Sequence, residues 1–192
     1  MCKIVNLISN RFDYNSIRFI EKLEQELSNR KIEVVIDNTY DFLTFFKRHK
    51  TYGISIGFDF YKDSESGRGI ILNKFSSNIS RAFAYGLSSN IDKVLPSKWR
   101  EFEFVKSDNK TWYKFFNKIS AEAKIIFYFG SKNNTEEFEE FLTSSEKFVK
   151  VFADEIVRCL RSDYNYLDYQ KRIDLYNRKN IIYQRNGGKN LV

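Results

Sequence analysis

The feature that most constrains this fold is an alternation of short apolar runs with amphipathic segments. Runs typical of buried strands occupy Lys3–Ile8, Ile32–Ile36, Tyr52–Phe60, Gly69–Leu72 and Ile125–Phe129. Between and after them, apolar residues recur every three or four positions, which predicts helices. These helices begin at Asn15 or Ser16 and at Ser76 or Ser77, and two more cover Thr135–Leu142 and Glu146–Leu160. Strands that alternate with helices predict an α/β fold with helices on both faces of the sheet.

Two further segments have weaker patterns. Asp41 can cap a short helix that carries Phe42, Phe45 and Phe46. Trp99–Val105 alternates like a strand, and Trp112–Phe116 is its predicted hairpin partner.

Composition excludes several classes of protein. Hydrophobic residues make up 42% of the 192-residue chain, which is enough for a sizeable core and excludes general disorder. No apolar run approaches the roughly 20 residues that span a bilayer. The first residues lack a secretory signal, so we expect a cytoplasmic protein that reaches a cell wall only by a route without a signal. Two cysteines and the single His49 exclude a disulfide framework and a histidine cluster.

Charge divides the chain into a nearly neutral body and a basic tail. From Arg158 onward, eight Lys and Arg face three Asp, so this part carries +5 of the net charge of +7. Five tyrosines follow Leu160 among Asn, Arg and Lys. We therefore predict an α/β domain over residues 1–160 and a basic, Tyr-rich extension over residues 161–192.

The order of these segments resembles the type-3 N-acetylmuramoyl-L-alanine amidases, a family that includes clostridial phage endolysins. Lys3-Ile4-Val5 matches the family's first strand, and Tyr52–Tyr61 matches the strand that normally ends in Ser-x-His-x-Asn. Gly67-Arg68-Gly69 matches the glycine before the next strand, and Ile125–Glu137 matches the closing segment. The resemblance covers roughly residues 3–160 and implies a central mixed, largely parallel sheet.

The resemblance also implies a zinc ion held by two histidines and a glutamate, with a second glutamate as general base. In this chain those four positions hold Asn10, Arg11, Asp59 and Tyr128. Asn is a poor zinc ligand, an Arg places a cation where the metal would sit, and one Asp supplies a single ligand. We therefore expect no zinc, no other cofactor and no amidase catalysis, and an Arg11–Asp59 ion pair could fill the site.

Three functions remain open at this point. The first is a catalytically inactive amidase homologue that binds peptidoglycan or a protein partner. The second is a divergent peptidoglycan hydrolase built around Asp59, and the third is a cytoplasmic nucleic-acid or regulatory binding protein that reuses the fold. The four substituted positions either form a remodelled ligand pocket or are ordinary polar residues at strand ends, where clefts of α/β sheets form.

The tail offers its own alternatives. It is either a solvated helix packed on the domain or a binding segment for an anionic wall polymer, a nucleic acid or a protein partner. The residues predicted to bind an anionic polymer are Arg161, Lys171, Arg172, Arg178, Lys179 and Arg185. Nothing in the sequence fixes the oligomeric state.

Overall fold

The computed structural model describes residues 3–9, 13–37, 52–63, 67–73, 76–95, 99–104, 115–161, 170–171 and 174. The helix predicted after Asp41 lies outside these residues, as does nearly all of the predicted tail. Within the described residues, no helix is both long enough and apolar enough to cross a membrane.

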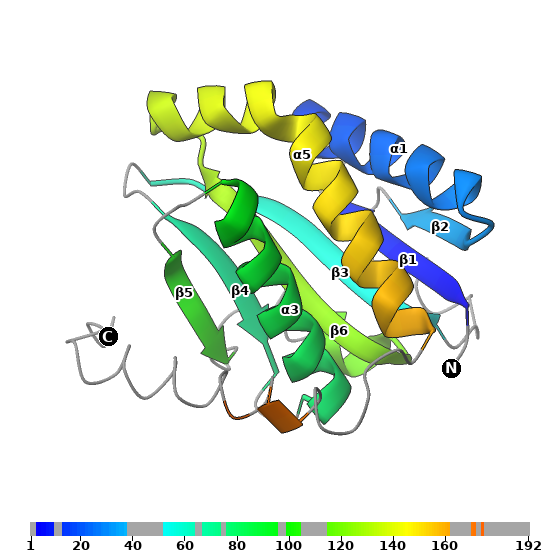
Figure 1. Ribbon diagram of the computed structural model, residues 1–192. Helices are drawn as coiled ribbons and strands as arrows, with labels where there is room; N and C mark the ends of the chain where they lie inside the picture. The colour runs from blue at the N-terminus through cyan, green and yellow to red at the C-terminus, as the bar shows by residue number, and fades with distance from the viewer. Residues whose placement is uncertain are drawn as a thin grey trace.

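Six strands form one mixed sheet in the order β2-β1-β3-β6-β4-β5 (Figure 1). Neighbouring strands are parallel except β4 and β6, which are antiparallel. The largely parallel sheet predicted from the resemblance is therefore confirmed. The strands are β1 (Ile4–Ser9), β2 (Glu33–Asp37), β3 (Tyr52–Tyr61), β4 (Arg68–Leu72), β5 (Trp99–Phe104) and β6 (Ala121–Ser131).

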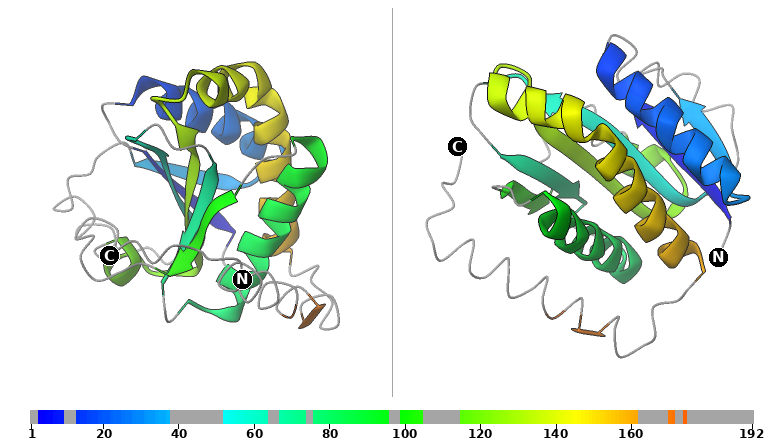
Figure 2. Two further views of the ribbon diagram at one scale, coloured as in Figure 1. Left: turned by 90° about the vertical axis from the view of Figure 1, so that its left-hand side faces the viewer. Right: turned by 45° about the horizontal axis from the view of Figure 1, so that its top comes forward.

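Three long helices cover one face of this sheet (Figure 2). They are α1 (Tyr14–Asn29), α3 (Asn78–Val94) and α5 (Thr135–Leu160). On the opposite face, a helical turn at residues 115–118 packs Phe115 and Phe116 against Ile126 of β6. Lys124 holds this turn, because its Nζ donates to the carbonyls of Phe116 at 2.6 Å and Ile119 at 3.0 Å. Burial lowers the pKa of Lys124.

The hairpin partner of β5 and the cap of α1 differ from the predictions. The predicted hairpin partner of β5 is wrong, because residues 115–118 are helical and β5 pairs with β4. The helix α1 is capped by Asp13, whose carboxylate accepts the backbone N–H groups of Asn15 and Ser16. An Asp cap two residues earlier satisfies the free N–H groups of the first turn equally well.

The two helices predicted between Thr135 and Leu160 are one continuous helix, α5, whose axis bends part way along (Figure 1). The Thr143 hydroxyl donates to the carbonyls of Glu139 at 2.9 Å and Glu140 at 3.2 Å. Such bonds back to the preceding turn favour a bend in a helix. The bend therefore has a local cause at the place where the sequence predicted a break.

The core between the sheet and the long helices is rich in phenylalanine. Phe129 of β6 lies at its centre, with its ring centroid 4.5 Å from that of Phe141 and 4.7 Å from that of Phe19. It also contacts the rings of Phe58, Phe60, Phe127 and Phe148. One side chain thus joins the central strands to α1 and α5.

We predict that Phe129→Ala lowers the free energy of unfolding by about 3–5 kcal/mol, because it removes a buried ring and leaves a cavity. Urea unfolding followed by circular dichroism measures this loss. Phe129→Leu should lose less, and Tyr14→Ala, at a side chain that is 71% exposed, should change stability by under about 0.5 kcal/mol. A Phe129→Ala protein as stable as the Tyr14→Ala control would contradict this account of the core.

Candidate functional site

The candidate site lies at the edge of the sheet where the parallel strands end. β1, β3 and β6 run in the same direction and are neighbours, so their carboxyl ends meet at one edge. We call this the carboxyl edge. β4 begins there because it is antiparallel to β6. The carboxyl edges of α/β sheets are where ligand clefts usually form.

Two of the four predicted site residues are described, and the structure brings them together. Asp59 and Tyr128 are register partners on β3 and β6, and partners on adjacent strands project to the same face of a sheet. That face is the one opposite the long helices, because Tyr128 packs with Phe115 and Ile126. Asn10 and Arg11 lie outside the described residues, and so does the predicted Arg11–Asp59 ion pair.

Tyr128 is covered by a second tyrosine ring from the end of β3. The pairing of β3 with β6 shifts between Asp59 and Tyr61. Beyond the shift, the rings of Tyr61 and Tyr128 are stacked, with centroids 4.3 Å apart and planes 10° from parallel. Tyr128 is only 8% exposed. The position where the resemblance implies a general base is therefore occupied by a phenol ring covered by a second aromatic ring.

Asp59 is half-buried, and its carboxylate accepts the backbone N–H of Phe60 at 2.9 Å. It is the one zinc-ligand residue type among the four positions. Across the described ranges, no three His, Cys, Asp or Glu side chains are grouped so that they could hold a metal ion. The donors at Asp59 and Tyr128 do not fit the zinc centre that the resemblance implies.

The loop after β6 is bonded to the end of β3. Ser131 Oγ donates to the carbonyl of Asp63, and Asn133 Nδ2 donates to the carbonyl of Lys62. Lys132 Nζ lies 2.8 Å from the Asp13 carboxylate and 5.1 Å from the centroid of the Phe60 ring. Because Asp13 caps α1, this ion pair connects the first helix to the carboxyl end of β6.

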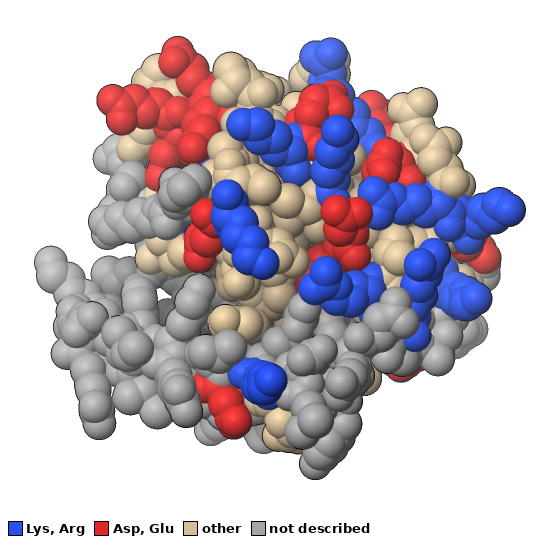
Figure 3. Space-filling model, in the orientation of Figure 1, with Lys and Arg blue, Asp and Glu red and all other residues tan. Residues whose placement is uncertain are grey.

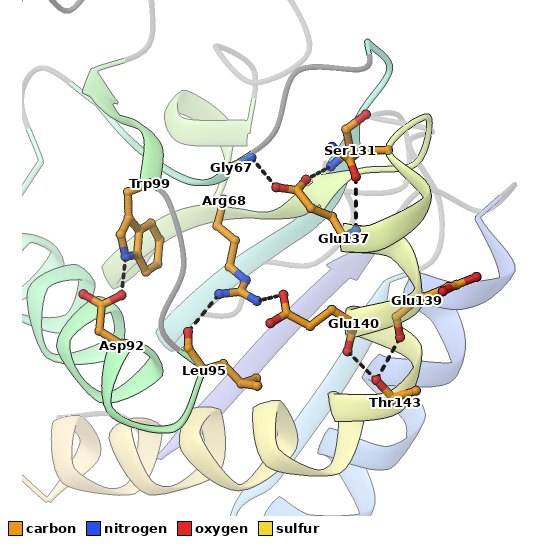
Figure 4. Close-up of polar contacts among 11 residues, drawn as sticks. Gly67, Arg68, Asp92, Leu95, Trp99, Ser131, Glu137, Glu139, Glu140 and Thr143 are labelled. Atoms are coloured by element: carbon orange, nitrogen blue, oxygen red, sulfur yellow. Dashed lines mark hydrogen bonds and ion pairs between the residues drawn. The ribbon is translucent and has the colours of Figure 1, made fainter.

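Glu137 in the first turn of α5 binds two distant backbone groups (Figure 4). Its carboxylate accepts the N–H of Gly67, before β4, and the N–H of Ser131 at 2.9 Å. Gly130 makes room for it, because a Cβ at Gly130 would lie 2.7 Å from Glu137 Oε2 and φ there is +135°. Glu137 therefore fixes the end of β6, the start of β4 and the start of α5 together.

Arg68, the first residue of β4, connects the strand to the layer of long helices (Figure 4). Its guanidinium lies 2.5 Å from the Glu140 carboxylate and donates to the Leu95 carbonyl at 3.1 Å. It also stacks over the Phe148 ring, 4.9 Å from the centroid. Burial lowers the pKa of Arg68, and the Glu140 carboxylate opposes that shift. We call Gly67, Arg68, Ser131, Glu137 and Glu140 the Glu137–Arg68 network.

Sequence reasoning did not find this network. The spacing from Asn134 to Glu137 does signal a helix start, and Asn134 Oδ1 accepts the Glu137 N–H at 3.2 Å. Nothing in the local pattern indicates that the Glu137 side chain reaches Gly67, which is 70 residues away.

The predicted polymer-binding residues are mostly outside the described part of the chain. Arg161 follows the last residue of α5 as its C-cap, and Lys171 is exposed. The other four, Arg172, Arg178, Lys179 and Arg185, are not among the described residues. The polymer-binding role of the tail and the boundary at residue 160 therefore stay predictions.

A scan against protein-family models finds no match, and a search of curated proteins finds none either. Solved structures, however, share the fold. The N-acetylmuramoyl-L-alanine amidase from Clostridium difficile 630 matches with a TM-score of 0.63 at 14% identity, over 87% of this chain and 97% of that one. The catalytic domain of the CD27L endolysin, which targets Clostridia difficile, matches with 0.60 at 10% identity, over 82% and 98%.

A third structure, the CwlD amidase from Clostridioides difficile in complex with the GerS lipoprotein, matches with a TM-score of 0.56 at 12% identity, over 90% of this chain and 99% of that one. These matches span most of both chains, so the protein is an α/β protein of amidase architecture. The predicted resemblance is confirmed for the fold, which is that of the N-acetylmuramoyl-L-alanine amidases. At such low identity, chemistry must be argued from this chain's own residues.

We predict that Glu137→Gln lowers the free energy of unfolding by about 1.5–3 kcal/mol, because it weakens two hydrogen bonds to a charged acceptor. Urea unfolding of the full-length variant measures the loss. Glu136→Gln is the matched control, because Glu136 is exposed in the same first turn. It should lose only the helix-dipole contribution, about 0.3–1 kcal/mol. Equal losses in the two variants would contradict the role given to Glu137.

Proposed function

We propose that this protein is a catalytically inactive homologue of the N-acetylmuramoyl-L-alanine amidases that acts by binding peptidoglycan. The observation that carries the proposal is the stack of Tyr61 on Tyr128 beside Asp59. It fills the place where the amidase resemblance implies a glutamate base.

Hydrolysis of an amide needs an activated water and a group that takes its proton. The usual general bases are histidine, glutamate and aspartate side chains, and Tyr128 is none of these. Asp59 alone supplies one carboxylate, which is too few ligands for a catalytic zinc ion. These residues support a role in which the fold is retained and the reaction is lost.

Binding is the role that the same edge can still perform. Asn10, Arg11, Asp59 and Tyr128 would form a remodelled pocket of amide, cation, carboxylate and aromatic ring. Such a mixture suits a ligand that carries hydroxyl, amide and carboxylate groups, as peptidoglycan does. The named amidases and the endolysin domain that share the fold support this choice of polymer. The basic tail would add attraction to anionic wall polymers.

A protein partner is the second candidate. One amidase of this fold, CwlD, has been solved in complex with a lipoprotein. In that case the remodelled edge would contact a protein instead of a glycan, and the purified chain would not be retained on isolated walls.

We predict that the full-length protein releases no amino groups from purified peptidoglycan above the buffer rate, with or without added zinc, and carries no stoichiometric zinc after purification without chelator. Amino-group labelling and elemental analysis measure the two quantities. Release that disappears in Asp59→Ala but persists in the exposed-site variant Glu136→Ala would support a divergent hydrolase instead.

We predict that retention on isolated walls falls as salt rises, because exposed charges are screened over about 10 Å at 0.1 M ionic strength. The full-length variant with glutamine at Arg172, Arg178, Lys179 and Arg185 should be retained less. A control variant removes as many charges from exposed positions of the domain, with glutamine at Lys3, Lys31, Lys93 and Lys147. Pelleting assays compare the two. Equal losses would show that only net charge matters, and stronger retention on single-stranded nucleic acid would favour the nucleic-acid alternative.

A further inference from the structure

A groove of about 250 Å³ lies between α1 and α5, in the helix layer and away from the Asp59–Tyr128 pair. Its floor contains the buried rings of Phe19 and Phe141. One end is closed by Lys22 of α1, whose Nζ lies 2.6 Å from the Glu146 carboxylate and 3.4 Å from Ser145 Oγ of α5. The groove thus has an apolar floor and a fixed polar end.

The remaining walls carry a charged side chain and an apolar side chain that are both exposed to solvent. Arg18 is four residues before Lys22 on the same face of α1, is exposed, and has no hydrogen-bond or ion-pair partner among the described residues. Across from it, Leu142 of α5 is 48% exposed, and Tyr14, one turn before Arg18, is 71% exposed. Only three large hydrophobic side chains are so exposed in the described part of the chain, and the third is Val94 of α3. In the described part of the chain, two of the three most exposed large hydrophobic side chains therefore lie near a cation that has no partner there.

We propose that this groove binds a short acidic segment of a partner protein, in which a carboxylate lies next to an apolar side chain. The carboxylate pairs with the Arg18 guanidinium, which can donate two parallel hydrogen bonds to it. The apolar side chain packs on Leu142 above Phe19 and Phe141, where it removes exposed hydrocarbon from water. The polar groups of Asn15 and Ser145 line the groove and can bond the segment's backbone.

Charge complementarity decides between this occupant and the alternatives. Residues 161–192 hold seven Lys and Arg against three Asp, so Arg18 would repel the chain's own tail. Figure 3 shows a group of acidic side chains over the first turns of α5, where Glu136 and Glu137 lie, and basic and acidic side chains interspersed over the rest of this face. At the groove itself, Lys22 is already paired with Glu146, so Arg18 is the charge that a ligand meets, and it favours an acidic segment over a basic one. This inference does not rest on the proposed function, because it uses neither the carboxyl edge nor the tail.

The test uses the full-length protein and two fluorescein-labelled peptides of equal length. In one, two leucines are followed by two glutamates, and in the other lysines replace the glutamates. Fluorescence anisotropy should show binding of the glutamate peptide, weakened by added salt. Arg18→Gln should weaken it about tenfold, the loss typical of one charge-assisted hydrogen bond. Leu142→Ala should weaken it about threefold through lost apolar contact.

The matched control is Lys93→Gln, which removes an exposed cation from the end of α3 and should leave binding unchanged. Backbone amide NMR shifts on titration should be largest at Asn15, Arg18, Leu142 and Ser145. Arg18 and Leu142 are exposed, so thermal melting should show both variants folded. Equal binding of the lysine peptide, or equal losses in Arg18→Gln and Lys93→Gln, would overturn the proposal. So would an Arg18-dependent dimer that excludes the peptide, because the occupant would then be a second copy of the chain.

Discussion

The pairing of β3 with β6 is the constraint on which the candidate site depends. Its register makes Asp59 and Tyr128 neighbours on one face of the sheet. Tyr61 follows Asp59 by two residues, so it projects to the same face, and its ring stacks on that of Tyr128. The pairing of these two strands thus decides which side chains meet at the carboxyl edge.

The sequence predicts the strands that form this site better than it predicts the contacts between their side chains. Apolar runs identify the central strands because strands buried on both faces exclude polar residues, as in Ile125–Phe129. That Asp59 and Tyr128 belong to one site came from the family resemblance, and the pairing of β3 with β6 does bring them together. The tyrosine stack could not be predicted, because a contact between two strands depends on their pairing, which the pattern of either strand alone does not give. Phe115 and Phe116, at the end of the predicted strand Trp112–Phe116, lie in a helical turn instead, because aromatic pairs suit either structure and tertiary packing favours the helix here.

The carboxyl edge is held together by the chain's own polar groups. Lys132 pairs with the carboxylate that caps α1, and Glu137 binds backbone groups from two strands. Charged partners of this kind give strong hydrogen bonds. The architecture shared with the amidases is therefore held together at this edge by bonds within the chain.

The strand order has a consequence for how the chain folds. β1, β2 and β3 can pair with one another, and β4 can pair with β5, but β6 lies between β3 and β4 and comes later in the sequence than both. The β2-β1-β3 part and the β4-β5 part of the sheet can join only after β6 has been added between them. The helix α5 then packs across α1 and α3. Such non-local closure slows folding, and during synthesis it leaves the edges of β3 and β4 open to pairing with other chains.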